Sequence, residues 1–157
     1  MKSIFVVRGA GHASTAMASY DAALAAANIH NYNLTTISSV IPAEAVVEVV
    51  ETAPDLGPTG NQLTVVEARM TTAEAGEVAA GLGWTTGTGP GLFYEATGTD
   101  PEMVRQTINR GLSAGAALRE WSFTDRQTMI ETAEGNPDGG YTTVIVVAAY
   151  GESESLF

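Results

Sequence analysis

Short runs of apolar and β-branched residues, separated by glycine, proline and asparagine, dominate this chain. Such runs are typical of β-strands, and the residues between them are typical of turns. Residues 76–84 also fit a helix, but the three glycines among them and the strands on either side favour a strand of small residues. The predicted strands cover residues 3–8, 31–37, 44–51, 61–70, 76–84, 91–97, 121–134 and 141–150.

The first predicted helix follows a turn at Gly9 to Gly11. It begins at a cap formed by Ser14 and ends at about Asn28, because serine is a good N-cap and asparagine a common helix terminator. Asp21 lies at the margin of its apolar face. The residues predicted to form that face are Met17, Tyr20, Leu24 and Ala27.

The second predicted helix spans about 101–118, with Asp100 as the N-cap and Pro101 at the first helical position. A turn is expected at 135–140, and the last residues, 151–157, are expected to fray. Two helices and several mostly antiparallel strands indicate an α+β sandwich, formed by residues 1–157 as a single domain. The predicted core face of the second helix comprises Met103, Val104, Ile108 and Leu112.

Composition excludes several classes of protein. A formal net charge of −11 disfavours binding to nucleic acids and anionic membranes, and is consistent with a salt-rich cytosol. The short apolar run at the N-terminus is interrupted by Arg8, so we expect neither a signal peptide nor a membrane span. We therefore expect a cytoplasmic location. There is no cysteine, and the two histidines, His12 and His30, lie far apart, so no metal site is expected.

Lysine is almost absent from the chain. Its only lysine is Lys2, at the terminus, so there is no internal lysine to form a Schiff base with pyridoxal phosphate. An amino-acid decarboxylase with this sequence would therefore need another electrophile. A carbonyl made from the backbone would meet that need.

The strand predicted at 31–37 ends in two serines, Ser38 and Ser39, and Pro42 stiffens the segment that follows them. A serine hydroxyl held in this position could attack the preceding carbonyl and shift the acyl group from nitrogen to oxygen, provided that a donor stabilises the oxyanion. A pair of serines in an ordinary loop is the alternative.

Glu95 is an acid in an otherwise uncharged predicted strand. The alternation places Leu92, Tyr94 and Ala96 on one face of this strand and Phe93, Glu95 and Thr97 on the other. By pattern alone, Glu95 fits a surface position, and Asp21 fits a helix-surface acid or the partner of an arginine.

The serine segment resembles the processing site of the pyruvoyl-dependent arginine decarboxylases. This resemblance implies that the chain cuts itself between Ser38 and Ser39, giving fragments 1–38 and 39–157, and that Ser39 becomes a covalent pyruvoyl group. The residues that stand as in that family are Asn33, Leu34, Ile37, Ser38, Ser39 and Pro42.

The resemblance extends to the candidate acids. Gly91, Leu92 and Glu95 follow the family's Gly-Leu-x-x-Glu pattern, which implies that Glu95 is the general acid that protonates the carbanion carbon after carbon dioxide leaves. Asp21 takes the place of the family's acid that meets the guanidinium of arginine. Leu24 and Tyr32 occupy positions that line the family's substrate pocket.

Taken together, the resemblance implies a four-layer αββα sandwich, assembled as a trimer or a dimer of trimers with the site between subunits. The implied reaction converts L-arginine to agmatine and carbon dioxide, without pyridoxal phosphate or a metal. Asn33 is our candidate for the oxyanion donor during self-cleavage and for later positioning of the pyruvoyl carbonyl. Two alternatives remain open, a decarboxylase of another amino acid and an uncleaved, non-catalytic trimeric binding module.

Overall fold

The computed structural model describes residues 2–135 and 138–157, and its strands form two sheets. One sheet has five strands in the order β2-β5-β9-β1-β4, and the other has four in the order β3-β7-β6-β8. The five-stranded sheet comprises β1 (Lys2–Ala13), β2 (Asn33–Thr36), β4 (Ala45–Val49), β5 (Gln62–Thr72) and β9 (Tyr141–Glu154). The four-stranded sheet comprises β3 (Val40–Ile41), β6 (Glu77–Thr86), β7 (Gly91–Gly98) and β8 (Asp125–Glu134).

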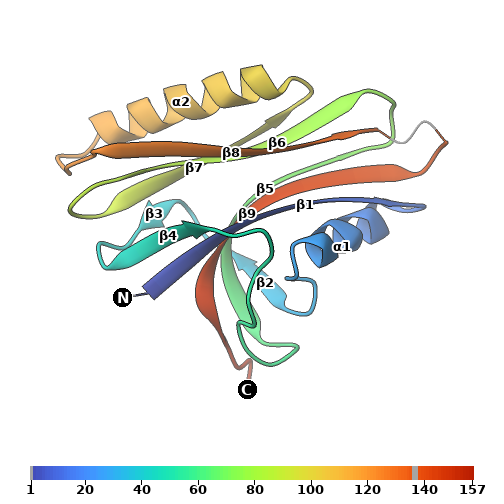
Figure 1. Ribbon diagram of the computed structural model, residues 1–157, viewed down its shortest axis with the longest axis horizontal. Coiled ribbons are helices and arrows are strands. Elements are labelled where there is room, and N and C mark those ends of the chain that lie inside the picture. The colour runs from blue at the N-terminus through green and yellow to red at the C-terminus, as the bar shows by residue number, and fades with distance from the viewer. Residues whose placement is uncertain (1, 136–137) are drawn as a thin grey trace.

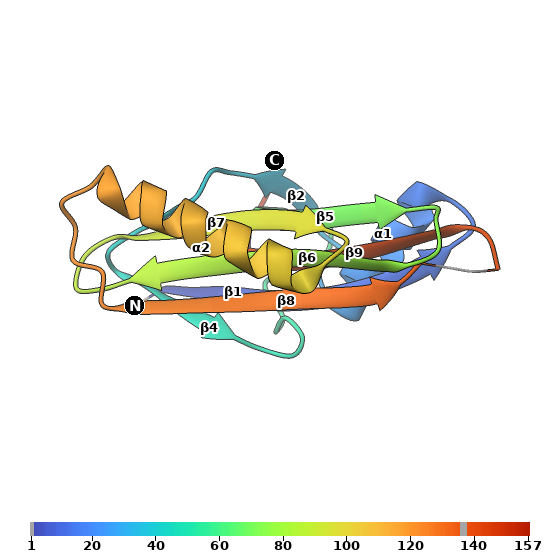
Figure 2. The ribbon, with the colours of Figure 1, turned by 90° about the horizontal axis from the view of Figure 1, so that it is seen from above.

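The sheets pack face to face, and one helix covers each outer surface (Figures 1 and 2). Helix α1 (Ala16–Ala26) lies on the five-stranded sheet and α2 (Pro101–Ala117) on the four-stranded sheet. Most strand pairs are antiparallel, and β1 with β4 and β2 with β5 are the parallel pairs. The α+β sandwich is thereby confirmed, with its layers in the order α1, sheet, sheet, α2.

Strand β9 is apolar on both faces because both faces are buried. Val144, Val146 and Ala148 face the core between the two sheets. The alternate residues Ile145 and Val147 face the core beneath α1. A strand buried on both faces needs a continuous apolar run rather than an alternating one, and this strand has one.

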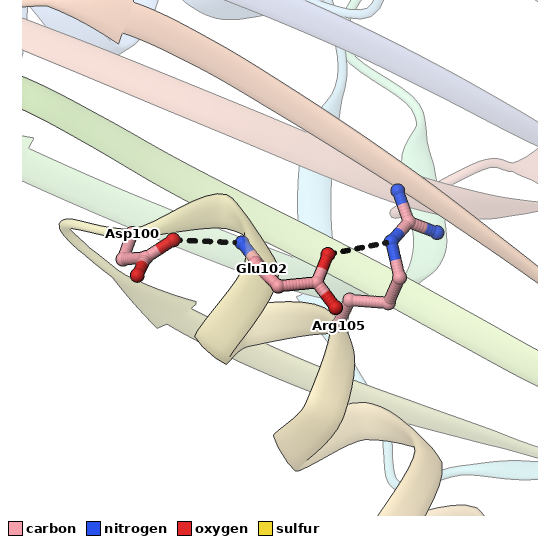
Figure 3. Close-up of polar contacts among 3 residues, drawn as sticks. All are labelled: Asp100, Glu102 and Arg105. Carbon is pink, nitrogen blue, oxygen red and sulfur yellow. Dashed lines mark hydrogen bonds and ion pairs between the residues drawn. The ribbon is translucent and has the colours of Figure 1, made fainter.

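Helix α2 begins as predicted. The side chain of Asp100 accepts a hydrogen bond from the amide of Glu102 at 2.9 Å, and Pro101 opens the helix. Glu102 in turn lies 3.9 Å from Arg105 on the exposed side of the helix, as Figure 3 shows. Within the described ranges, no helix is long and apolar enough to cross a membrane.

The turn predicted at Gly9 to Gly11 is wrong, because β1 continues through these residues to Ala13. A Cβ atom on Gly9 would lie 2.3 Å from the carbonyl oxygen of Ala23, and one on Gly11 would lie 2.5 Å from the amide of Ala23. These glycines therefore allow α1 to lie directly on the strand. The helix begins later than predicted and is capped by Thr15, whose hydroxyl accepts from Ala18, rather than by Ser14.

Other predictions about element ends and faces also need correction. The sequence predicts Met17 and Met103 in the core, but they are 73% and 64% exposed, because each helix contacts its sheet along a narrower stripe than the sequence suggests. The tail was expected to fray, but β9 extends to Glu154, which pairs with Gln62. The strand expected from residue 121 begins at Asp125. Residues 136 and 137 of the predicted turn lie outside the described ranges.

Candidate active site

Ser38 and Ser39 lie where the chain crosses from one sheet to the other (Figure 1). Before the serines, the amide of Ile37 donates to the carbonyl of Val65 in β5 at 2.9 Å. After them, β3 pairs with β7 in the opposite sheet. Ser38 is exposed and Ser39 is half-buried, so the predicted scissile bond lies in an accessible crossover between two sheets.

A backbone hydrogen bond connects the serines to the strand that carries Glu95. The carbonyl oxygen of Ser39 accepts from the amide of Phe93 at 2.8 Å, extending the register in which Val40 lies opposite Leu92. Opposite residues of an antiparallel pair project to the same face, as do residues two apart on one strand. Ser39, Phe93 and Glu95 therefore share one face of the four-stranded sheet.

The alternation predicted for β7 is confirmed. Leu92 and Ala96 pack into the cluster beneath α2, whereas Phe93 lies in the core between the sheets. Glu95, on the same face as Phe93, is exposed. The described residues of one chain therefore do not form an apolar pocket around the carboxyl group of Glu95.

Asn33 lies at the start of β2, and its side chain is engaged by a neighbouring loop. Its side-chain amide donates to the carbonyl of Gly60 at 2.8 Å, and its backbone amide donates to Asn61 at 2.8 Å. An asparagine side chain carries two N–H donors, so the contact with Gly60 leaves one for another acceptor. The role of Asn33 as the oxyanion donor stays a prediction.

The three residues predicted to bind substrate belong to α1 and to the loop after it. Asp21 is exposed on the outer side of the helix. Leu24 is only 7% exposed and packs in the core beneath α1. Among the described residues, Asp21 has no arginine within 4.0 Å, so the alternative that paired Asp21 with an arginine of the same chain does not hold.

Tyr32 stabilises the loop that precedes β5. Its hydroxyl donates to the carbonyl of Gly57 at 3.0 Å and accepts from the amide of Leu56 at 3.1 Å. Its half-buried ring packs against the core beneath α1. In the single chain, both contacts give Tyr32 a structural role in holding this loop.

A polar cluster surrounds Tyr20, the residue before Asp21 in α1. The hydroxyl of Tyr20 donates to Glu67 at 2.6 Å, and the guanidinium carbon of Arg69 lies 4.1 Å from the centre of the Tyr20 ring. Burial, reinforced by the hydrogen bond to Glu67, raises the pKa of Tyr20 to about 12. Tyr20 therefore stays a hydrogen-bond donor throughout the neutral range.

The two parts of the predicted site are separated within one chain. Helix α1, which carries Asp21, packs on β1, β9 and β5, whereas Ser39 leads into β3 at the edge of the other sheet. Figure 1 shows α1 and β3 on opposite sides of the view. Asp21 thus lies on the layer outside the five-stranded sheet, whereas Ser39 is hydrogen-bonded to the four-stranded sheet.

A cavity of about 790 Å³ lies where β9 parts from β1. Ile4 and Tyr150 form the last pair between these strands, after which β9 follows β5. Pro42 lines the cavity close to the serine segment. The lining of the cavity also includes four carboxylates, Glu44, Asp55, Glu152 and Glu154.

Neither histidine is part of a metal centre in the described part of the chain. The Nδ1 atom of His12 lies 2.8 Å from the hydroxyl of Thr142, within hydrogen-bonding distance. Among residues 2–135 and 138–157, no three His, Asp or Glu side chains are arranged to hold a metal ion.

Phe93 is the residue that the sequence did not single out. It acts through its backbone amide, which any residue except proline supplies, so no side-chain pattern could have identified it. Its position two residues before Glu95 becomes informative only when the register between β3 and β7 is known.

Residues 3–155 match the family model described as pyruvoyl-dependent arginine decarboxylase. A relative of that name from Halobacterium salinarum is 50% identical over 159 residues, which cover 100% of this chain and 99% of the relative. Relatives of the same name from Thermococcus kodakarensis and Pyrococcus horikoshii are 33% and 30% identical, each over 83% of this chain and 87% of the relative.

Proposed function

The chain belongs to the pyruvoyl-dependent arginine decarboxylase family, and from this premise we propose that its pyruvoyl group is made from Ser39 by cleavage of the Ser38–Ser39 bond. The activity is that of a carboxy-lyase, which converts arginine to agmatine and carbon dioxide. The observation that carries the proposal is the hydrogen bond from Phe93 to Ser39, which joins the serine segment to the strand of Glu95.

The cleavage needs no external oxidant. The Ser39 hydroxyl attacks the Ser38 carbonyl, so the peptide C–N bond breaks and an ester forms. Elimination then removes the α-proton of Ser39, forms a double bond between its α- and β-carbons and breaks the bond between the β-carbon and the ester oxygen, so that Ser38 leaves as a carboxylate. The remaining enamine tautomerises, and water hydrolyses it to a ketone with release of ammonia.

Cleavage at this point would leave the two fragments joined by the five-stranded sheet. Fragment 1–38 contains β1, which pairs with β9 on one side and β4 on the other. Both partners belong to fragment 39–157. The ladders and the apolar core would therefore retain the smaller fragment without a covalent bond.

The residues around position 39 fit a pyruvoyl group. Its amide carbonyl is the former carbonyl of Ser39, and the amide of Phe93 already donates to that oxygen at 2.8 Å. The group supplies an electrophilic ketone and an electron-withdrawing carbonyl beside it. Phe93 orients that carbonyl and stabilises negative charge on it. Glu95, on the same face, delivers the proton to the substrate carbon.

We assign Asp21 to the guanidinium of arginine, with Leu24 and Tyr32 beside it. A carboxylate binds a planar guanidinium through two parallel hydrogen bonds, which favours arginine over an acidic or apolar amino acid. Because Asp21 and Ser39 lie in separate parts of one chain, the proposal includes a homotrimer, or a dimer of trimers, in which one subunit supplies each. A cytoplasmic location stays a prediction.

The exposed apolar residues support an oligomer. Ile37 and Val40, on either side of the serines, are 39% and 45% exposed, and Val49 on the edge strand β4 is 48% exposed. Exposed apolar side chains next to a candidate site, such as Ile37 and Val40, are typical of an interface.

The mass of the purified, denatured protein tests the proposal. We expect two fragments, 1–38 and 39–157, and a larger fragment that has a reducible ketone in place of a free α-amine. Arginine added to this protein should yield agmatine without added cofactor. A single uncut chain would contradict the assignment of Ser39 and favour a non-catalytic role.

A further inference from the structure

The carbonyl of Val40 is held by a residue from the other sheet. β3 is an edge strand, and Val40 lies opposite Leu92 of β7. Successive carbonyls of a strand point to opposite sides, so the Ser39 carbonyl faces β7 and the Val40 carbonyl faces away from it. The hydroxyl of Tyr150 donates to this outward carbonyl at 3.0 Å.

Tyr150 is itself firmly placed. It lies on β9, opposite Ile4 of β1 and Thr64 of β5, so neighbouring strands hold its backbone on both sides. Its ring packs against that of Phe93 with 6.2 Å between ring centres, and Phe93 packs against Trp84 at 6.1 Å. Burial raises the pKa of Tyr150 to about 12, so its hydroxyl remains a donor at neutral pH.

Phe93 and Tyr150 thus hold two consecutive carbonyls from opposite sides. The amide of Phe93 binds the carbonyl of Ser39, and the hydroxyl of Tyr150 binds that of Val40. The aromatic contact between Phe93 and Tyr150 joins these two supports. The serine segment is therefore positioned by both sheets and not by β7 alone.

We propose that Tyr150 is a positioning residue, which fixes the new N-terminus at residue 39 after cleavage so that the former Ser39 carbonyl stays on the Phe93 amide. The proposal rests on the proposed function, because it requires the cut at Ser38–Ser39. Before the cut, the chain through β2 tethers the segment. After it, the reacting end continues into a strand of only two residues, of which Ile41 is buried in the core, and free ends fray unless they are tied down.

The cavity explains why a single hydroxyl has this importance. Tyr150 and Pro42 both line it, so open space lies beside the segment that follows the serines. Pro42 is exposed, so the packing of this residue does little to hold the segment on that side. The hydrogen bond from Tyr150 to Val40 provides the restraint instead.

Tyr150→Phe tests the proposal because it keeps the ring against Phe93 and removes only the hydroxyl. We expect complete self-cleavage, a kcat lowered about three- to tenfold, which corresponds to one hydrogen bond, and a KM for arginine within about twofold of the parent. In the cleaved protein, the peptide that covers residues 39–42 should exchange its amide hydrogens faster than in the parent. Tyr141→Phe, at the opposite end of β9, is the matched control and should change none of these values.

The outcomes separate this inference from the proposed function. An uncut parent protein would refute the assignment of Ser39. A cut and active parent, with a Tyr150→Phe variant whose kcat and exchange match it, would overturn the role of Tyr150 alone. A lower kcat with unchanged exchange at 39–42, or a raised KM with unchanged kcat, would also overturn it.

Discussion

The amide of Phe93 donates to the carbonyl of Ser39 at 2.8 Å, and this bond places the serine pair next to the strand of Glu95. Ser39 and Glu95 lie far apart in the sequence and belong to different strands. The register between β3 and β7 nevertheless puts both side chains on one face of the four-stranded sheet. The roles proposed for Ser39 and Glu95 require this arrangement.

Replacing Ser39 tests self-cleavage. Ser39→Ala should fold normally and stay a single full-length chain, because alanine has no oxygen to form the ester. Ser38→Ala is the matched control, since it keeps the attacked carbonyl and the nucleophile, and it should still be cut. Denatured mass and the oligomeric state are the measurements. Cutting at 38/39 in Ser39→Ala would refute the mechanism.

Glu95→Gln tests the general acid. The variant keeps the shape of the side chain and removes its transferable proton, so we expect normal cleavage and a kcat lowered by roughly 10²-fold or more. Glu77→Gln, an exposed acid in β6 of the same sheet, should retain the parent rate. Agmatine formation by fully cleaved samples is the measurement. Unchanged turnover in Glu95→Gln would return Glu95 to the role of a surface acid.

Asp21→Asn tests recognition of arginine. The charge on Asp21 takes no part in the acyl shift, so cleavage should be complete. Loss of one partner of a charged, hydrogen-bonded pair costs about 2–5 kcal/mol, so kcat/KM for arginine should fall roughly 30-fold or more. Glu102→Gln removes an exposed acid from the other helix and should leave kcat/KM unchanged (Figure 3). A cleaved Asp21→Asn enzyme with the parent's kcat/KM would show that the pocket lies elsewhere.

Gly83→Ala tests the packing of α2 on β6. A Cβ atom at this position would lie 2.2 Å from the Cγ2 atom of Ile108, so either the Ile108 side chain or the helix must shift. We expect a loss of about 1–3 kcal/mol in the free energy of unfolding, measured in urea at fixed protein concentration. Gly89→Ala has no neighbour within 4 Å of the added atom and should unfold like the parent. Equal stability of both variants would contradict the tight contact.

Tyr20→Phe tests the polar cluster through its pH dependence. The pKa of Tyr20 is about 12 in the folded chain, against an ordinary value of 10.0. Unfolded chains therefore lose this proton first, so its contribution to stability is complete below pH 10 and is lost as the pH rises through 12. When the pH is raised from 9 to 11, the free energy of unfolding, measured in urea, should fall more for the parent than for Tyr20→Phe. Equal losses would show that Tyr20 ionises normally in the folded state.

Local signals in the sequence determined most of the secondary structure. The predicted strand at 76–84 is confirmed as β6, and Asp100 and Pro101 do open α2. The alternation of side chains predicted for β7 is also confirmed. These features depend on interactions within a few residues, which a linear pattern records directly. The chemical candidates were likewise recognisable from linear spacing, because the resemblance rests on residue types at fixed intervals.

Tertiary structure alone decided the features that depend on contacts between distant residues. The sequence predicts a turn at Gly9 and Gly11, but these glycines allow α1 to lie close to β1. This role follows from the position of Ala23 above them, which only the tertiary structure gives. The hydrogen bonds that hold the serine segment also depend on the tertiary structure. Phe93 binds the carbonyl of Ser39 through its backbone amide, and Tyr150 binds the carbonyl of Val40 from the other sheet. A backbone donor has no sequence signature, and a hydrogen bond across two sheets depends on how they pack. The separation of Asp21 from Ser39 is also a property of layer packing, because neither residue's neighbours along the chain specify it.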